Sequence, residues 1–139
     1  MPIILKDKIK PVAARLYPAH GDWSLDIDFA PFDVEVDGKF ERFEYPFRGE
    51  AVELKTDDPM VFVGQTLDFP RNPEDGYIDG SVYFHHAHNP VDITRLTFAQ
   101  DAGGSLRLAV DSTWVMSFEQ SDFEDFDLSF EVPLTISRK

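Results

Sequence analysis

Apolar and polar residues alternate along most of this chain. The clearest run occupies every second position near its end: Leu128, Phe130, Val132, Leu134 and Ile136. No stretch long enough for an ordinary helix has the helical period. Because successive side chains of a strand point to opposite faces, such alternation indicates strands with one face buried. We therefore predict an all-β fold, a single-domain antiparallel β-sandwich or flattened barrel of about eight to ten short strands with at most one short helical turn.

Turn-forming residues divide this pattern into segments. Asp37-Gly38 is a hairpin signal, because a tight primed turn needs positive φ at both central residues. The segment 101–104, Asp-Ala-Gly-Gly, predicts a second tight turn. Between these turns, the run 81–88 is apolar and aromatic enough for one largely buried strand. Asn89-Pro90 is expected to end that strand, because proline donates no hydrogen bond to a sheet.

Three segments are less regular. The segment 10–17 fits either a short strand or a single helical turn, since prolines lie at both of its ends. The short apolar run 59–63 is interpreted as a strand. The segment 70–76 is rich in Pro, Asn, Glu, Asp and Gly, and we predict that it forms the longest surface loop.

Length and composition suit one globular domain. The 139 residues, taken as a single domain over 1–139, are enough to bury a sizeable core, and thirteen Phe favour a sheet-rich core. The chain contains no cysteine and no apolar run long enough for a membrane span. The apolar patch within 1–8 is too short for a secretory signal. We therefore expect a cytoplasmic protein with no cofactor and no membrane association.

Acidic residues dominate the charge. The formal net charge is −13, from 26 acidic and 13 basic residues. The segment 22–58 alone holds twelve Asp and Glu against four Lys and Arg. Such a surface repels nucleic acid and anionic lipid, and attracts cationic partners. We expect either a solubilising surface or a docking face for a basic protein.

Phe40 breaks the alternation of its own strand. It lies on the opposite parity from Phe43, so either a β-bulge shifts the register or the ring is exposed. An exposed aromatic ring beside carboxylates is typical of a protein interface. The candidate partner-binding residues are therefore Glu35, Phe40, Glu41 and Glu44.

Three of the four histidines lie close together at 85, 86 and 88. On a single strand, His86 and His88 would project from one face, on the parity of Val82 and Phe84. With Gly80 and Asp92, their spacing resembles the first motif of the cupins, a family of double-stranded β-barrels. The resemblance implies one divalent transition metal inside the barrel, held by His86, His88 and Asp92. Asp92 stands where the family has Glu, Ala99 stands where it has Gly, and no second motif is found. Histidines held structurally by hydrogen bonds are the alternative.

Three functions are open. In size and charge the chain is similar in general character to bacterial immunity proteins, which implies a non-catalytic protein that occludes a basic protein partner such as a toxin. The alternative is a small cupin-like metal-dependent enzyme. A carbohydrate-binding sandwich is a third, although Trp23 and Trp114 fit core positions better than a binding platform. No catalytic residues are predicted, because Asp26 and Asp28 should face outward and remain solvated.

Overall fold

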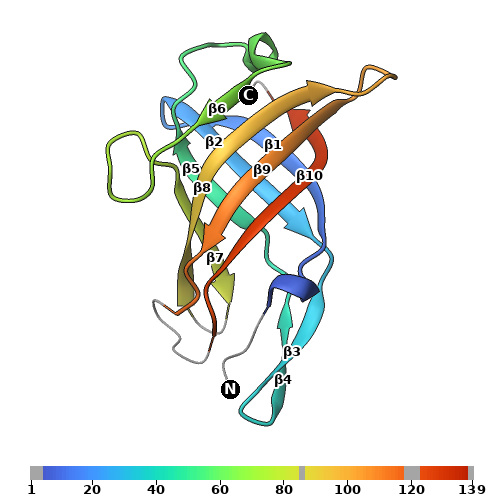
Figure 1. Cartoon of the computed structure of the whole chain (residues 1–139), viewed down its shortest axis with the longest axis vertical. Helices are drawn as coiled ribbons and strands as arrows, with labels where there is room; N and C mark the ends of the chain where they lie inside the picture. Colours follow the sequence, from blue (N-terminus) through green and yellow to red (C-terminus); the bar gives the residue numbers. More distant parts are fainter. Residues whose placement is uncertain (1–4, 85–86, 118–122, 138–139) are drawn as a thin grey trace.

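The computed structural model describes residues 5–84, 87–117 and 123–137, which form a β-barrel with a projecting hairpin (Figure 1). Ten strands make up most of the described chain, with two short 3₁₀ helices. The strands are β1 Pro11–Ala19, β2 Asp22–Phe29, β3 Phe32–Val36, β4 Lys39–Phe43, β5 Phe47–Val52, β6 Thr66–Asp68, β7 Asp79–Phe84, β8 Ala87–Gln100, β9 Leu106–Trp114 and β10 Phe126–Ile136. The helices are η1 Lys6–Lys8 and η2 Pro59–Phe62.

Seven strands close into a ring in the order β8-β7-β5-β2-β1-β10-β9 and back to β8. Six of the seven neighbouring pairs are antiparallel, and β1 runs parallel to β10. A ring with an odd number of strands cannot alternate direction throughout, so one parallel pair is required. The short β6 pairs with β8 beyond the end of β7. The fold-class prediction of a flattened β-barrel is confirmed, but the structure has two short 3₁₀ helices where at most one helical turn was predicted.

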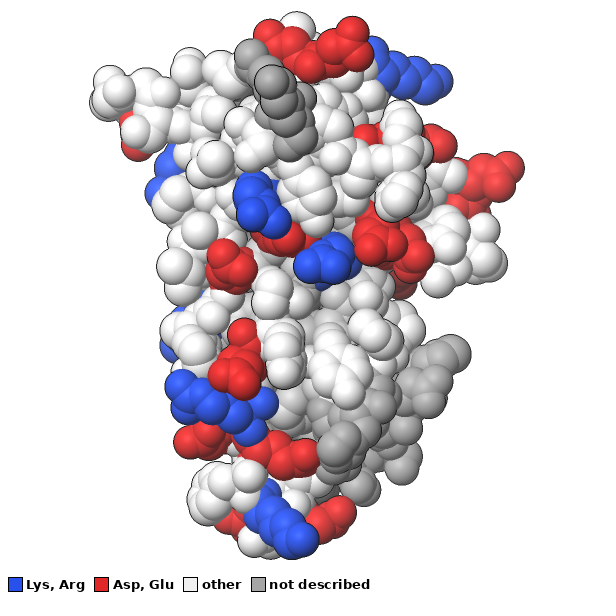
Figure 2. Space-filling model, turned by 180° about the vertical axis from the view of Figure 1, so that it is seen from behind, with Lys and Arg blue, Asp and Glu red and all other residues white. Residues whose placement is uncertain are grey.

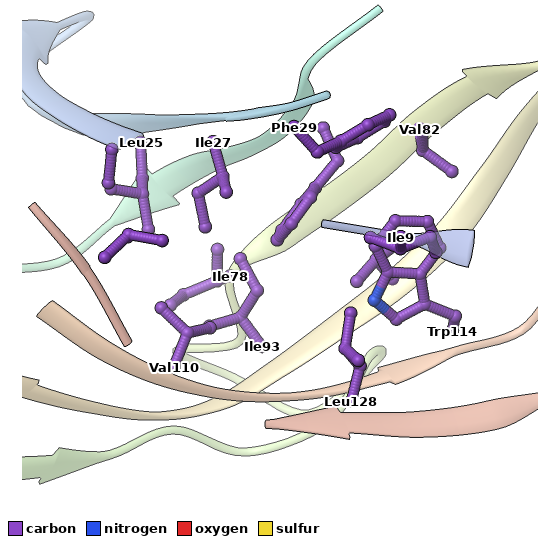
Figure 3. Close-up of a cluster of buried hydrophobic side chains, with 14 of the residues drawn as sticks. Ile9, Leu25, Ile27, Phe29, Ile78, Val82, Ile93, Val110, Trp114 and Leu128 are labelled. Atoms are coloured by element: carbon purple, nitrogen blue, oxygen red, sulfur yellow. The ribbon is translucent and has the colours of Figure 1, made fainter. Parts of the chain in front are cut away.

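The barrel interior is filled by side chains from all around the ring. Figure 3 shows Leu25, Ile27 and Phe29 of β2 facing residues of the opposite wall, including Val110, Trp114 and Leu128. The Trp114 side chain is completely buried, and its indole nitrogen donates to the Ser112 hydroxyl at 3.2 Å. Burying a large apolar side chain stabilises a fold by about 1.5–3 kcal/mol. The alternation in the sequence is therefore the source of the core.

Two glycines allow the strands to approach closely beside this core. Gly49 of β5 is paired with Gly80 of β7. A Cβ atom at Gly80 would overlap the backbone carbonyl oxygen of Val91 on β8. The close approach of two neighbouring strands therefore explains why residue 80 is glycine, and no metal motif is needed to explain it.

The prediction of one strand over 81–88 is wrong. The chain reverses there, and Phe84 of β7 is paired with Ala87 of β8. The break expected at Asn89-Pro90 is also absent, because β8 runs on to Gln100. Asn89 is completely buried, and its amide donates to the carbonyl oxygens of Val82 and Phe84, both at 3.4 Å. Pro90 is tolerated because its carbonyl oxygen still accepts a hydrogen bond, from the Val115 N–H at 2.9 Å.

The structure also decides the secondary structure of two other segments. The strand predicted over 59–63 is wrong, since this run forms η2. The Asp58 side chain caps it by accepting from the Met60 N–H at 3.1 Å, and Pro59 suits a first helical turn. The segment 10–17 adopts the strand alternative and belongs to β1.

Candidate functional site

The β3–β4 hairpin projects from the barrel as a separate two-stranded ribbon (Figure 1). Its turn is at Asp37-Gly38, with φ values of 53° and 80°, as the sequence predicts. Its register is unbroken, from Phe32 opposite Phe43 to Val36 opposite Lys39. No bulge therefore corrects the parity of Phe40, and the exposed alternative holds.

The face of this ribbon that carries Phe40 is called the hairpin outer face below. It consists of Asp33, Glu35, Phe40 and Arg42, with Glu44 just beyond β4. The Phe40 side chain is 73% exposed, more than any other large apolar residue of the described chain. Glu35 lies directly opposite it on β3. The result is an exposed ring beside solvated carboxylates.

The structure brings three of the four candidate partner-binding residues to this face. Arg42 lies 3.5 Å from the carboxylates of both Asp33 and Glu44, so Glu44 is joined to the face through Arg42. Glu41 does not join them. It lies opposite the buried Val34, on the other side of the ribbon, and is itself partly buried.

A buried carboxylate lies on the outside of the barrel. The expectation for Asp26 is half right: its side chain points outward, but the residue is only 7% exposed. Its two oxygens accept from Arg15 at 2.9 Å, Tyr17 at 3.1 Å and Arg48 at 2.8 Å. Asp28, two residues along β2, is exposed as expected.

Two groups of this cluster, Tyr17 and Arg48, have pKa values raised by their surroundings. Burial raises the pKa of the Tyr17 hydroxyl, and the negative charge and hydrogen bond of Asp26 raise it further. The hydrogen bond to Asp26 raises the pKa of the Arg48 guanidinium, so both Tyr17 and Arg48 keep their protons. We interpret the cluster as structural, because both oxygens of the Asp26 carboxylate already accept hydrogen bonds, from Arg15, Tyr17 and Arg48.

A groove lies beside Arg48, on the outer side of β5, β7 and β8. It has a volume of about 410 Å³ and is lined by Tyr45, Pro46, Arg48, Glu50, Ser81, Tyr83 and His88. The Tyr45 and Tyr83 rings meet edge to face at 5.8 Å, and the Tyr83 and His88 rings lie 5.1 Å apart. We call it the tyrosine groove. Sequence reasoning missed it, although the outward parity of Tyr83 between buried Val82 and Phe84 was a usable signal.

The structure keeps two of the cupin-like residues, His88 and Asp92, apart. His88 is exposed and lies opposite Tyr83, so the expectation that it shares the face of Val82 and Phe84 is wrong. Asp92 lies four residues along the same strand, about 13 Å away for an extended chain, which is too far for one metal ion. It is held instead by the Asn72 N–H at 3.3 Å and by Arg71. His86 lies outside the described residues.

No group of three or more potential metal ligands occurs within the described ranges 5–84, 87–117 and 123–137. Trp23 and Trp114 are both buried, as expected for core residues.

Charge is mixed on one face of the molecule. On the face seen in Figure 2, basic side chains lie beside acidic ones in several places. Among the helical segments that the structure describes, none is long and apolar enough to cross a membrane. Comparison of the chain with protein-family models, with curated proteins and with solved structures finds no match.

Proposed function

We propose that this protein is a non-catalytic binding protein that occludes a basic protein partner through the hairpin outer face. The observation that carries the proposal is the 73% exposure of Phe40 on a projecting ribbon beside Glu35. A lone exposed ring costs solubility and contributes little to folding. Its burial in a partner would remove apolar surface from water at a point that already projects from the barrel.

The charge of the ribbon favours a cationic partner. Between Phe32 and Tyr45 the chain carries five acidic residues and two basic ones, within a molecule of net charge −13. Long-range attraction of this kind raises the rate at which a basic protein finds the surface. The aromatic ring then supplies the desolvated anchor on which affinity depends.

The carboxylates of the hairpin outer face are solvated and therefore available to a partner. Glu35 forms no ion pair with any other described residue, and Glu44 has only a 3.5 Å contact with Arg42, which is itself half exposed. Partner Lys and Arg side chains can therefore pair with them without first breaking a buried network. Asp26, by contrast, is already covered by two arginines.

The test begins with capture of basic proteins from the native host on the immobilised full chain at low ionic strength. Binding of the captured protein is then measured for the wild type and for Phe40→Ala. We expect Phe40→Ala to weaken binding about 10- to 100-fold, mainly through faster dissociation. The association rate should fall about tenfold or more when the salt concentration is raised from about 20 to about 300 mM.

Val61→Ala is the matched control, because Val61 is also an exposed apolar residue, at 56%, but lies on η2. It should bind like the wild type. The proposal fails if no cationic protein is captured, or if Phe40→Ala and Val61→Ala retain the same partner equally well.

A further inference from the structure

The tyrosine groove presents ring surface that the fold does not use. Tyr45 is 54% exposed and Tyr83 is 41% exposed, although their rings contact each other. Tyr83 and His88 face each other across the β7–β8 pair, and Tyr45 lies in the segment between β4 and β5. The aromatic surface is thus assembled from three separate segments, of which β7 and β8 are neighbouring strands of the barrel.

The polar groups of the groove are of both kinds. Arg48 supplies N–H donors, and Glu50, two residues along the same strand, supplies carboxylate acceptors. Ser81 is the cross-strand partner of Arg48 and adds a hydroxyl. A ligand in this groove is therefore offered donors and acceptors side by side.

Asp26 holds the guanidinium group of Arg48 in place. The Nε atom of Arg48 donates to the buried Asp26 at 2.8 Å, and this is the one hydrogen bond that the Arg48 side chain makes within the described part of the chain. Arg48 lines the groove, and its Nη atoms make no hydrogen bond to another described residue, so they are available as donors for a ligand. Such anchoring orients the donors before the ligand arrives, which lowers the entropic cost of binding.

The charges select against ions of either sign. Arg48 disfavours a cationic ligand, whereas Glu50 and the net charge of −13 disfavour an anionic one. A neutral molecule remains, with an apolar face for the tyrosine rings and groups that both donate and accept. Sugar hydroxyls do both, and the C–H face of a pyranose ring is apolar. The volume of about 410 Å³ lies within the usual range for small-ligand sites.

We propose that the tyrosine groove is a binding site for a neutral carbohydrate. One pyranose ring packs against Tyr83 and Tyr45, while its hydroxyls accept from Arg48 and donate to Glu50. Asp26 acts as a positioning residue for Arg48 and does not touch the sugar. This site is separate from the hairpin outer face, and neither proposal depends on the other.

The test is a titration of the full chain with four neutral trisaccharides built from glucose (α- and β-linked), mannose and N-acetylglucosamine. Backbone amide shifts in a nitrogen–proton correlation spectrum report the site. At least one sugar should shift Arg48, Ser81, Tyr83 and His88 saturably, with a dissociation constant below about 10 mM. Tyr83→Ala should weaken that binding about tenfold or more, because the Tyr83 ring supplies the surface on which the sugar stacks.

Phe40→Ala is the matched control, since it removes an exposed ring from the hairpin outer face and should leave sugar binding unchanged. An anionic uronic-acid trisaccharide and a cationic glucosamine trisaccharide should each bind more weakly than the best neutral sugar. The proposal is overturned if no neutral sugar shifts these amides, if Tyr83→Ala binds as well as the wild type while its spectrum remains folded, or if a charged sugar binds best.

Discussion

The strands β2 and β3 alternate acidic and apolar residues in the same way, yet their acids have opposite environments. In β2, Asp26 is flanked by Arg15 on β1 and Arg48 on β5, and is buried. In β3, Glu35 has a neighbouring strand on one side only and lies beside an exposed ring. Period two therefore decides which way a side chain points, whereas the side chains on the neighbouring strands decide whether it is covered: Asp26 has an arginine on each side, and Glu35 has a cross-strand neighbour, Phe40, on one side only. The barrel wall is built for stability, and the hairpin leaves its outer face available.

The largest expected difference concerns the apolar residues of the two regions. Leu25→Ala should lower the free energy of unfolding by about 3 kcal/mol, because it leaves a cavity in the barrel interior. Phe40→Ala should change it by no more than about 0.5 kcal/mol, because its ring is in water. Urea unfolding followed by tryptophan fluorescence measures both. Equal losses would show that the hairpin outer face belongs to the core.

Replacing the acidic residues Asp26 and Glu35 tests the same contrast, with a smaller expected change in the free energy of unfolding. Asp26→Ala should lower the free energy of unfolding by about 2 kcal/mol, because Arg15, Tyr17 and Arg48 lose their common acceptor. The loss stays below that of a fully buried pair, since both guanidinium groups are about half exposed and screened by solvent. Glu35→Ala should be neutral within about 0.5 kcal/mol. A neutral Asp26→Ala variant would contradict the structural role of the cluster.

The smallest effect is a pH dependence confined to the barrel cluster. Because folding raises the Tyr17 pKa above its ordinary value of 10.0, the proton on Tyr17 stabilises the folded state. This contribution is complete below about pH 10 and is lost as the pH rises through the folded-state pKa. Tyr17→Phe should therefore be less stable than the wild type at pH 8, and the deficit should shrink above pH 10. A deficit that stays constant in urea unfolding up to about pH 11.5 would contradict the assignment.

Much of the fold is predictable because its signals are local. The run 23–29 alternates strictly and forms β2, and Asp37-Gly38 has the residues that a primed turn requires. The errors occur where local signals are weak or misleading. The β7–β8 reversal was missed because the run 81–88 looks like one continuous apolar strand. Pro90 was wrongly predicted to end a strand. Its missing N–H does not prevent strand pairing there, because the hydrogen bond formed at this position uses its carbonyl oxygen.

The site was less predictable, because it depends on which strands become neighbours. The sequence raised exposure of Phe40 as one of two alternatives, and only the unbroken β3–β4 register decides between them. The tyrosine groove joins residues from the segment before β5, from β7 and from β8. No spacing along the chain marks Tyr45 and Arg48 as neighbours of His88. The cupin-like spacing presumes a single strand over 81–88, whereas Phe84 of β7 is paired with Ala87 of β8.

The parallel pair β1–β10 has a consequence for biosynthesis. Ala14 is matched with Leu134, so the ring is closed by contacts between two strands far apart in the sequence, and β1 must wait until β10 has been synthesised. Until then the nascent sheet carries two unsatisfied edges, on β1 and β9, that are able to pair with another chain. Such distant pairing also implies slow folding, and premature stop codons before 134 should give aggregates instead of a smaller barrel.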